Sequence, residues 1–180
     1  MARKALWILA AASVVGIGAA LHVARAGDDP AGGGMPQGMP SPQKAIKHAF
    51  VDCMLGSWTT KSTGMMGEGT GTSTFRLGVG DTCLLHDYEM KAGAKQYFGH
   101  GVTKVSDDGK TITSWWIDNT ATEPVKMSGP LTEKGFEQTS STPGGPVMKV
   151  TFAKTDKGLE FKMYMGDQVA MTETYTPAPK

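Results

Sequence analysis

From Gly56 onward, apolar and polar side chains alternate in short segments rich in Thr, Val, Phe, Tyr and Trp. In segment 159–165 the odd-numbered residues are Leu, Phe, Met and Met, whereas the even-numbered ones are Glu, Lys and Tyr. Segment 147–154 repeats this pattern, with Met148, Val150 and Phe152 on one face. A period of two predicts β-strands with one apolar face and one solvated face.

Turn residues separate ten such segments, and Asp107-Asp108-Gly109, Asp156-Lys157-Gly158 and Gly166-Asp167 are the tight-turn signals. Gly and Asp accept the positive φ that hairpin turns need. Because every connection is short, we expect neighbouring strands to pair antiparallel. The expected strands are 57–63, 69–77, 82–90, 96–105, 111–117, 125–131, 135–141, 147–154, 159–165 and 168–175.

An antiparallel meander of this size either exposes two long edges or closes on itself, and closure removes the edges. The sequence therefore predicts an all-β fold, a closed up-and-down barrel of about ten strands. Such a barrel is wider than the eight-stranded kind that holds one small ligand, so an interior cavity is expected.

One helix is predicted before the strands. Ser41 is suited to the N-cap and Pro42 to the first helical position. Apolar residues such as Ile46 and Phe50 recur at helical spacing over 43–54. We expect one short amphipathic helix over this range, at the end of the barrel.

The N-terminus has the pattern of a signal peptide. Arg3 and Lys4 precede the uncharged segment 5–21, and Ala24-Arg25-Ala26 has the small-x-small pattern of a cleavage site. We expect residues 1–26 to direct export, giving a periplasmic or secreted protein. The alternative is an uncleaved anchor, because 17 apolar residues are at the short limit for spanning a bilayer of about 30 Å. Membrane contact is expected only through this segment, if it is uncleaved.

Three further ranges complete the expected organisation. Residues 27–42 contain five Gly and four Pro in 16 positions, which predicts a flexible tether. The folded domain is expected over 43–176, followed by a disordered tail at 177–180.

Composition excludes two classes of protein. The chain has 24 Gly and 10 Pro among 180 residues, which argues against a coiled coil or a long-helix bundle. Lys and Arg total 18 against 17 Asp and Glu, so the surplus of basic residues that nucleic-acid binding needs is missing. We therefore expect no nucleic acid as a partner.

Four short motifs carry a resemblance to a known family. They are Leu55-Gly56-Ser57-Trp58, the Gly-Thr-Gly-Thr-Ser-Thr run at 69–74, Trp116-Ile117-Asp118-Asn119, and the ending at 171–175. In order and spacing they resemble the exported bacterial family catalogued as domain of unknown function 1579. The resemblance implies a lipocalin-like or calycin-like barrel and implies no reaction. The chain departs from the family pattern at Asp81-Thr82-Cys83.

Cys53 and Cys83 are the only two cysteines. An oxidising compartment allows a disulfide between them, which would close a loop of about 30 residues and stabilise the fold by roughly 3–4 kcal/mol. Two free buried thiols are the alternative, and the spacing does not decide between them.

His86 and His100 form a candidate metal pair. If Ala92-Gly93-Ala94 makes a three-residue loop, the two histidines lie directly opposite each other on neighbouring strands, with His48 or Asp118 as a third ligand. A two-residue loop shifts the register by one residue and separates them. The simpler interpretation is two histidines bonded to water or backbone.

Other cofactor chemistry is less favoured. Some ten-stranded calycin-like barrels hold haem through a histidine on a late strand, and no histidine follows His100. The 12 methionines, including Met35, Met39 and Met65-Met66, could capture Cu(I), but Met is also the usual filler of irregular cores. We therefore expect no cofactor.

A candidate ligand-binding set comes from the aromatic strands. In the three-residue-loop register Tyr88 lies opposite Phe98 on the face of the histidines, and Trp116, Asp118 and Asn119 end a strand. An indole and two polar groups at a strand end could line a cavity mouth. The structural alternative is one core Trp, one surface Trp and an Asp-Asn turn.

No Gly-x-Ser-x-Gly elbow, and no glycine-rich phosphate loop between a strand and a helix, occurs in the chain. The sequence therefore predicts a non-enzymatic exported barrel that binds a small apolar molecule in its interior. The alternatives are a metal- or haem-binding barrel using His86 and His100, and a cell-envelope interaction scaffold with a filled barrel.

Overall fold

The computed structural model describes residues 43–140 and 147–179. The expected signal peptide, the expected tether and the expected N-cap Ser41 lie outside the described residues, as does Lys180.

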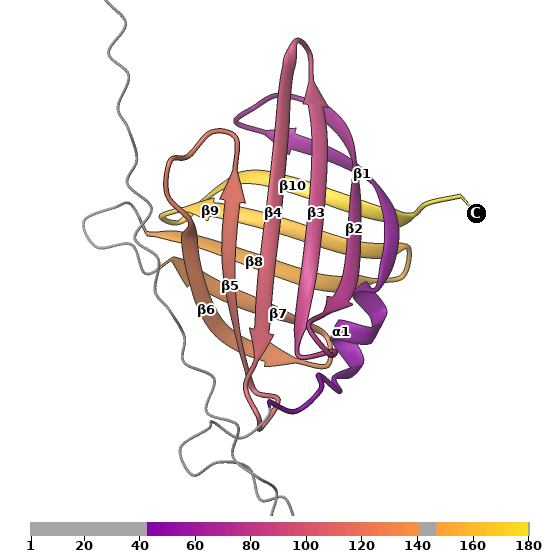
Figure 1. Ribbon diagram of the computed structural model, residues 1–180. Coiled ribbons are helices and arrows are strands. Elements are labelled where there is room, and N and C mark those ends of the chain that lie inside the picture. The colour runs from indigo at the N-terminus through magenta and orange to yellow at the C-terminus, as the bar shows by residue number, and fades with distance from the viewer. Residues whose placement is uncertain (1–42, 141–146, 180) are drawn as a thin grey trace, which may run out of the picture. The chain divides into compact units, whose positions relative to one another are not determined.

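The described residues form one short helix and a closed ten-stranded antiparallel barrel (Figure 1). Each strand pairs with the next one along the chain, and the last pairs with the first, so the predicted all-β closed barrel is confirmed. The elements are α1 (Ala49–Met54), β1 (Gly56–Gly64), β2 (Gly69–Gly78), β3 (Cys83–Ala92), β4 (Lys95–Val105), β5 (Thr111–Asp118), β6 (Val125–Thr132), β7 (Gly135–Ser140), β8 (Met148–Thr155), β9 (Gly158–Met165) and β10 (Gln168–Pro177).

Closure is made by β1 and β10, which pair from Trp58 opposite Pro177 to Gly64 opposite Met171. Both chain-end strands thereby gain partners on each side. Closure therefore leaves none of the ten described strands with an unpaired edge that another chain could extend.

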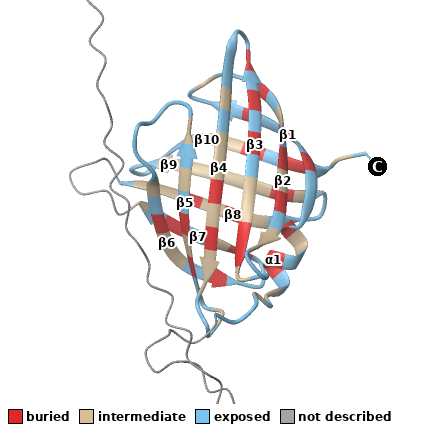
Figure 2. Cartoon of the chain, in the orientation of Figure 1, coloured by how far each residue is buried: buried red, intermediate tan, exposed pale blue. Residues whose placement is uncertain are grey.

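More buried and more exposed residues alternate along many of the strands, as the colouring in Figure 2 shows. In β8, Val150 and Phe152 are buried, and in β9 Leu159 is buried, as the sequence pattern predicts. Burial of these apolar side chains supplies the main favourable free energy of folding.

The helix α1 lies at one end of the barrel, beside the ends of β2 and β3 (Figure 1). Its residues Phe50, Val51 and Met54 are fully buried and join the main hydrophobic cluster. The other members of this cluster are Trp58, Phe75, Leu84, Ile112, Leu131, Phe152, Leu159 and Tyr175. The helix therefore seals that end of the barrel with apolar side chains.

The helix is shorter than expected. It begins at Ala49, not near Gln43, because His48 is the N-cap and its Nδ1 accepts a hydrogen bond of 3.2 Å from the Phe50 amide. The amide of Ile46 donates to the carbonyl of Asp81 at 2.8 Å, which engages the preceding segment with the β2–β3 turn. An amide committed to another segment cannot take part in a helical ladder.

The expected disordered tail is wrong at its first residues. Pro177 belongs to β10, and the Ala178 amide donates to the Ser57 carbonyl at 2.9 Å. Pairing with β1 orders the chain two residues beyond Thr176.

Both cysteines are free thiols, so the disulfide alternative is wrong for this structure. The Cys83 thiol donates to the Gly78 carbonyl at 3.3 Å within its own hairpin, whereas Cys53 lies in α1. Burial raises the pKa of the Cys53 thiol, which favours the protonated form.

Among residues 43–140 and 147–179, no helix has the length and apolar composition needed to cross a membrane.

Candidate ligand-binding cavity

The barrel encloses a cavity of about 410 Å³. Inward-facing residues of the strands line it, and Met54 of α1 contributes from the sealed end. Residues of two connections line it as well, Met65 and Met66 between β1 and β2, and Thr120 and Ala121 between β5 and β6. These connections lie at the end of the barrel opposite α1, which makes that end the candidate entrance.

Most of the cavity wall is apolar. Methionine and aromatic side chains provide the larger part of it, and methionine adapts to ligands of irregular shape because it is flexible and polarisable. The apolar lining residues are Met54, Met65, Met66, Phe75, Leu84, Ile112, Val125, Met127, Phe136, Met148, Val150, Phe152, Phe161, Met163 and Met171.

One side of the cavity is an aromatic wall formed by His86, Tyr88, Tyr97 and Trp116. The ring centroids of His86 and Trp116 are 5.2 Å apart, and those of Tyr88 and Tyr97 are 5.8 Å apart. These spacings are typical of aromatic pairs in contact. The wall spans β3, β4 and β5.

The position of Trp116 depends on two glycines of β4. A Cβ atom at Gly99 would lie 2.0 Å from Cζ2 of the indole, and one at Gly101 would lie 3.0 Å from Cε3. Gly101 is the direct cross-strand partner of Trp116. The indole therefore lies flat on a strip of bare backbone, and its other face is left for the cavity.

Glu173 of β10 is the most buried acidic group of the site, with 2% of its surface exposed. Its Oε1 accepts a hydrogen bond from the Tyr88 hydroxyl and its Oε2 accepts one of 2.8 Å from the Tyr175 hydroxyl. Burial raises the pKa of Glu173, although the hydrogen bonds from Tyr88 and Tyr175 oppose this shift. Burial and the nearby carboxylate also raise the pKa of Tyr88, so the phenol remains the donor.

Asp118 ends β5 and forms a second polar group with the aromatic wall. Its Oδ2 accepts hydrogen bonds from the Tyr97 hydroxyl at 2.9 Å and from Trp116 Nε1 at 3.1 Å. Its Oδ1 accepts from the amides of Thr120 and Ala121. Burial acts to raise the pKa of Asp118, but the hydrogen bonds from Thr120, Tyr97 and Ala121 outweigh it and lower the pKa.

His86 faces the cavity from β3. Its ring stacks on Phe75 with centroids 4.0 Å apart, and its Nε2 hydrogen-bonds to Ser73 Oγ at 2.8 Å. Burial lowers the pKa of His86 to about 3, so the imidazole is neutral at neutral pH.

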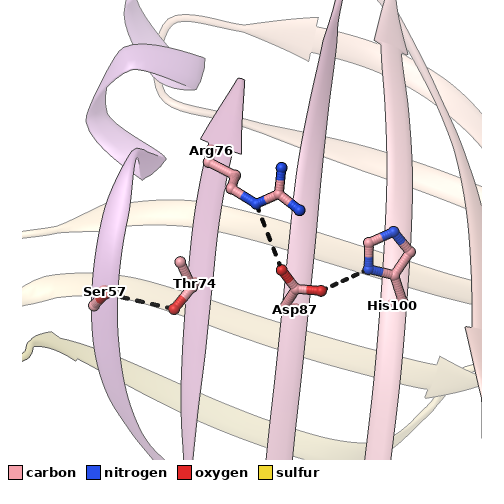
Figure 3. A network of polar contacts seen from close by, with 5 residues as sticks. All are labelled: Ser57, Thr74, Arg76, Asp87 and His100. Atoms are coloured by element: carbon pink, nitrogen blue, oxygen red, sulfur yellow. Dashed lines mark hydrogen bonds and ion pairs between the residues drawn. The ribbon is translucent and has the colours of Figure 1, made fainter. Parts of the chain in front are cut away.

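His100 lies on the outer surface of the barrel, so the candidate metal pair is wrong. The β3–β4 loop has two residues, which places His86 opposite Gly101 and His100 opposite Asp87. On the outer surface His100 Nδ1 lies 2.6 Å from Asp87 Oδ1, and Asp87 Oδ2 lies 3.7 Å from Arg76 Nε (Figure 3). Neighbouring positions along a strand point to opposite faces, so a shift of one residue separates the two histidines.

The proposed third ligands are also separate from His86. His48 caps α1 at the sealed end, and Asp118 bonds to Tyr97 and Trp116. In the described part of the chain, no three His, Cys, Asp or Glu residues are grouped closely enough to hold a metal ion.

The structure places three of the five candidate ligand residues, Tyr88, Trp116 and Asp118, on the cavity wall. Phe98 instead points outward from β4 with 43% of its surface exposed. Asn119 is exposed and serves the β4–β5 pairing, because its Oδ1 accepts from the Phe98 amide at 2.9 Å.

The sequence pattern did not single out Glu173, Tyr97 or the two glycines beneath Trp116. Glu173 carries a usable signal, because it falls between Met171 and Tyr175 at the inward-facing positions of β10. An acid among apolar inward positions of a strand is rare without a partner or a role. Gly99 and Gly101 carry no such signal in the sequence, because their role depends on the Trp116 side chain of the neighbouring strand β5.

Comparison with protein-family models finds no model that matches the chain, and comparison with curated proteins finds no significant match.

Proposed function

We propose that this protein is an exported, non-enzymatic binding protein that holds one small, largely apolar molecule inside its barrel. The observation that carries the proposal is the cavity of about 410 Å³ lined mainly by Met and aromatic side chains. This volume falls within the roughly 300–1,000 Å³ of small-molecule sites, which combine apolar walls with a few polar groups. Glu173 and Asp118 with their hydrogen-bonded tyrosines are the polar groups that would orient the ligand.

Export and the lipocalin-like family remain part of this proposal. Their support is the signal-peptide pattern of residues 1–26 and the short motifs around Trp58 and Trp116. Fold resemblance alone does not define a ligand.

A binding role fits the polar groups better than catalysis does. Ser73 and His86 are the arrangement closest to a nucleophile with its base, at 2.8 Å. The Ser73 side chain is not among the residues lining the cavity, and burial lowers the pKa of His86 to about 3. An imidazole with such a low pKa is a weak base for activating a hydroxyl near neutral pH.

Native mass spectrometry of the protein purified from its own host tests the proposal. We expect a non-covalent adduct of defined mass that organic solvent releases, and saturable binding of the neutral dye N-phenyl-1-naphthylamine by the emptied protein. The absence of both an adduct and saturable dye binding would contradict the proposal.

Two variants of β9 locate the bound dye. Met163 lines the cavity, whereas Tyr164 lies on the outer face beneath the Lys149 ammonium, 4.5 Å from the ring centroid. Met163→Trp fills part of the cavity and should weaken dye binding at least severalfold. Tyr164→Trp adds the same side chain outside and should leave binding unchanged, with circular dichroism confirming that both variants fold.

A second candidate function is an interaction scaffold. The observation that favours it is the exposure of Phe98 and Ile117, which are 43% and 52% exposed on the outer faces of β4 and β5. Exposed apolar side chains that gather on one surface mark interaction sites. Under this function, Phe98→Ser with Ile117→Ser would abolish partner binding and leave dye binding intact.

A further inference from the structure

The described part of the cavity lining contains acidic side chains but no basic ones that would be charged at neutral pH. Glu173 and Asp118 are its two acidic lining residues, and none of the described residues that line it is Lys or Arg. His86, which also lines it, has its pKa lowered to about 3 by burial and is therefore neutral. A ligand entering the barrel meets carboxylate oxygens without any cationic side chain to balance them.

Glu173 has hydrogen-bond donors but no cationic partner among the cavity-lining residues that the structure describes. Both donors to its oxygens, Tyr88 and Tyr175, are neutral phenols, which satisfy lone pairs without supplying positive charge. A buried carboxylate without a cationic partner is costly, so a cation that reaches it gains more than it would in water. An anionic ligand in the same cavity meets repulsion.

The aromatic wall points to the same ligand charge. Tyr88, Tyr97 and Trp116 lie between the two carboxylates, with the Tyr97 hydroxyl bonded to Asp118 and the Tyr88 hydroxyl bonded to Glu173. The faces of aromatic rings carry partial negative charge and attract ammonium groups. Rings and carboxylates together form one continuous electronegative surface on one side of the cavity.

We propose that the ligand of this cavity carries a positively charged nitrogen on a largely apolar body, as in an alkylammonium or arylammonium compound. The ammonium group would lie against Tyr88, Tyr97 and Glu173, and the apolar body would pack on the methionine and phenylalanine side chains of the remaining wall. This inference rests on the proposed function and selects against fatty-acid anions as ligands.

The test compares three ten-carbon ligands that differ in the charge of the head group. Decyltrimethylammonium, decanol and decanoate are titrated against N-phenyl-1-naphthylamine bound to the full chain at pH 7.5. The two ionic ligands are kept below their micelle concentrations and decanol below its solubility limit. We expect decyltrimethylammonium to displace the dye at a concentration about tenfold lower than decanoate requires, with decanol between them.

Charge-removing variants test whether the preference for the cationic ligand arises inside the cavity. Glu173→Gln and Asp118→Asn keep the shape of each side chain and should reduce the ratio between the two charged ligands. Glu137→Gln is the matched control, because this glutamate is exposed on β7 and pairs with Lys149 at 3.7 Å. It removes the same charge from the protein outside the cavity and should keep the wild-type ratio.

The outcomes separate this inference from the proposed function. If the dye binds but decanoate displaces it as well as or better than decyltrimethylammonium, the charge inference is overturned and the binding function stands. A cation preference that survives in both Glu173→Gln and Asp118→Asn also overturns the inference, because the preference then arises elsewhere. If no dye binds in a saturable manner, the proposed function is wrong and the inference falls with it.

Discussion

The hydroxyl of Tyr88 in β3 donates a hydrogen bond to the carboxylate of Glu173 in β10, although the two residues are 85 positions apart in the chain. Strands β1 and β2 separate these two strands in the barrel. The contact is therefore made inside the lumen, across two intervening strands, and exists only when the barrel is closed. It connects the binding site with the closure of the fold.

Removal of the Tyr88 hydroxyl should destabilise the protein. Tyr88→Phe leaves one buried oxygen of Glu173 without its donor, and hydrogen bonds to charged groups contribute about 1.5–3 kcal/mol. We expect a loss of this size in the free energy of unfolding, measured by urea denaturation. Tyr164→Phe, on the outer face of β9, should change it by less than about 0.5 kcal/mol. Equal effects of the two substitutions would refute this role of Tyr88.

Substitution of Gly99 should displace the Trp116 indole. The new Cβ would lie 2.0 Å from Cζ2 of the indole, so Gly99→Ala forces the ring to move. We expect a destabilisation of about 1–3 kcal/mol, an altered near-ultraviolet circular dichroism spectrum and weaker dye binding. Gly101→Ala should have a smaller effect, because its Cβ would lie 3.0 Å from the ring. An unchanged spectrum in Gly99→Ala would contradict this packing.

His86 should make the protein sensitive to mild acid. Burial lowers its pKa from 6.5 to about 3 in the folded state, so below pH 6.5 the unfolded chain takes up a proton that the folded protein does not. Stability from this group is complete above pH 6.5 and is lost as the pH falls toward 3, by up to about 1.4 kcal/mol per pH unit.

His86→Phe removes this titration and keeps a ring stacked on Phe75. In urea denaturation at pH 7 and pH 5, we expect the wild-type protein to lose more stability than the variant over this interval. The comparison cancels the contribution of Glu173, which both proteins share and whose raised pKa acts in the opposite direction. Parallel losses in the two proteins would show that His86 does not cause the acid sensitivity.

Val79 in the β2–β3 turn has a φ of +49°, a backbone conformation that β-branched residues rarely adopt. Asn accepts this conformation more easily, and the left-handed region costs most L-residues roughly 1–2 kcal/mol. Because the Val79 side chain is exposed, Val79→Asn removes little packing. We expect a stabilisation of about 1 kcal/mol, seen as a rise of about 2–4 °C in Tm. A fall in Tm would contradict the interpretation that the backbone at Val79 is strained.

The strand pattern of the sequence was sufficient to predict the barrel, since all ten strands lie within two residues of the expected bounds. Alternation of polar and apolar residues fixes the inward faces of β8 and β9, where Val150 and Met163 point into the lumen as expected. The predicted start of the helix was wrong because the N-cap is His48, and histidine is not among the usual capping residues.

The site was predictable only in part because its geometry depends on the register of one hairpin. Gly93 has a φ of +61° and stands first in a two-residue loop, an arrangement that favours glycine at that position. A three-residue loop would have placed His86 and His100 together, whereas the observed loop directs one inward and the other outward. Contacts between distant strands, such as that of Tyr88 with Glu173, require closure to be known first.

The central claim is that a ligand occupies the interior of the barrel, and methionine methyl signals test it most directly. The chain labelled with ¹³C at the methionine methyl groups would be titrated with decanol and followed by NMR. We expect the signals of the lumen residues Met127, Met148 and Met163 to shift in a saturable manner, while that of Met165, which does not line the cavity, stays in place. Unmoved lumen signals, or a shift confined to Met165, would contradict the claim.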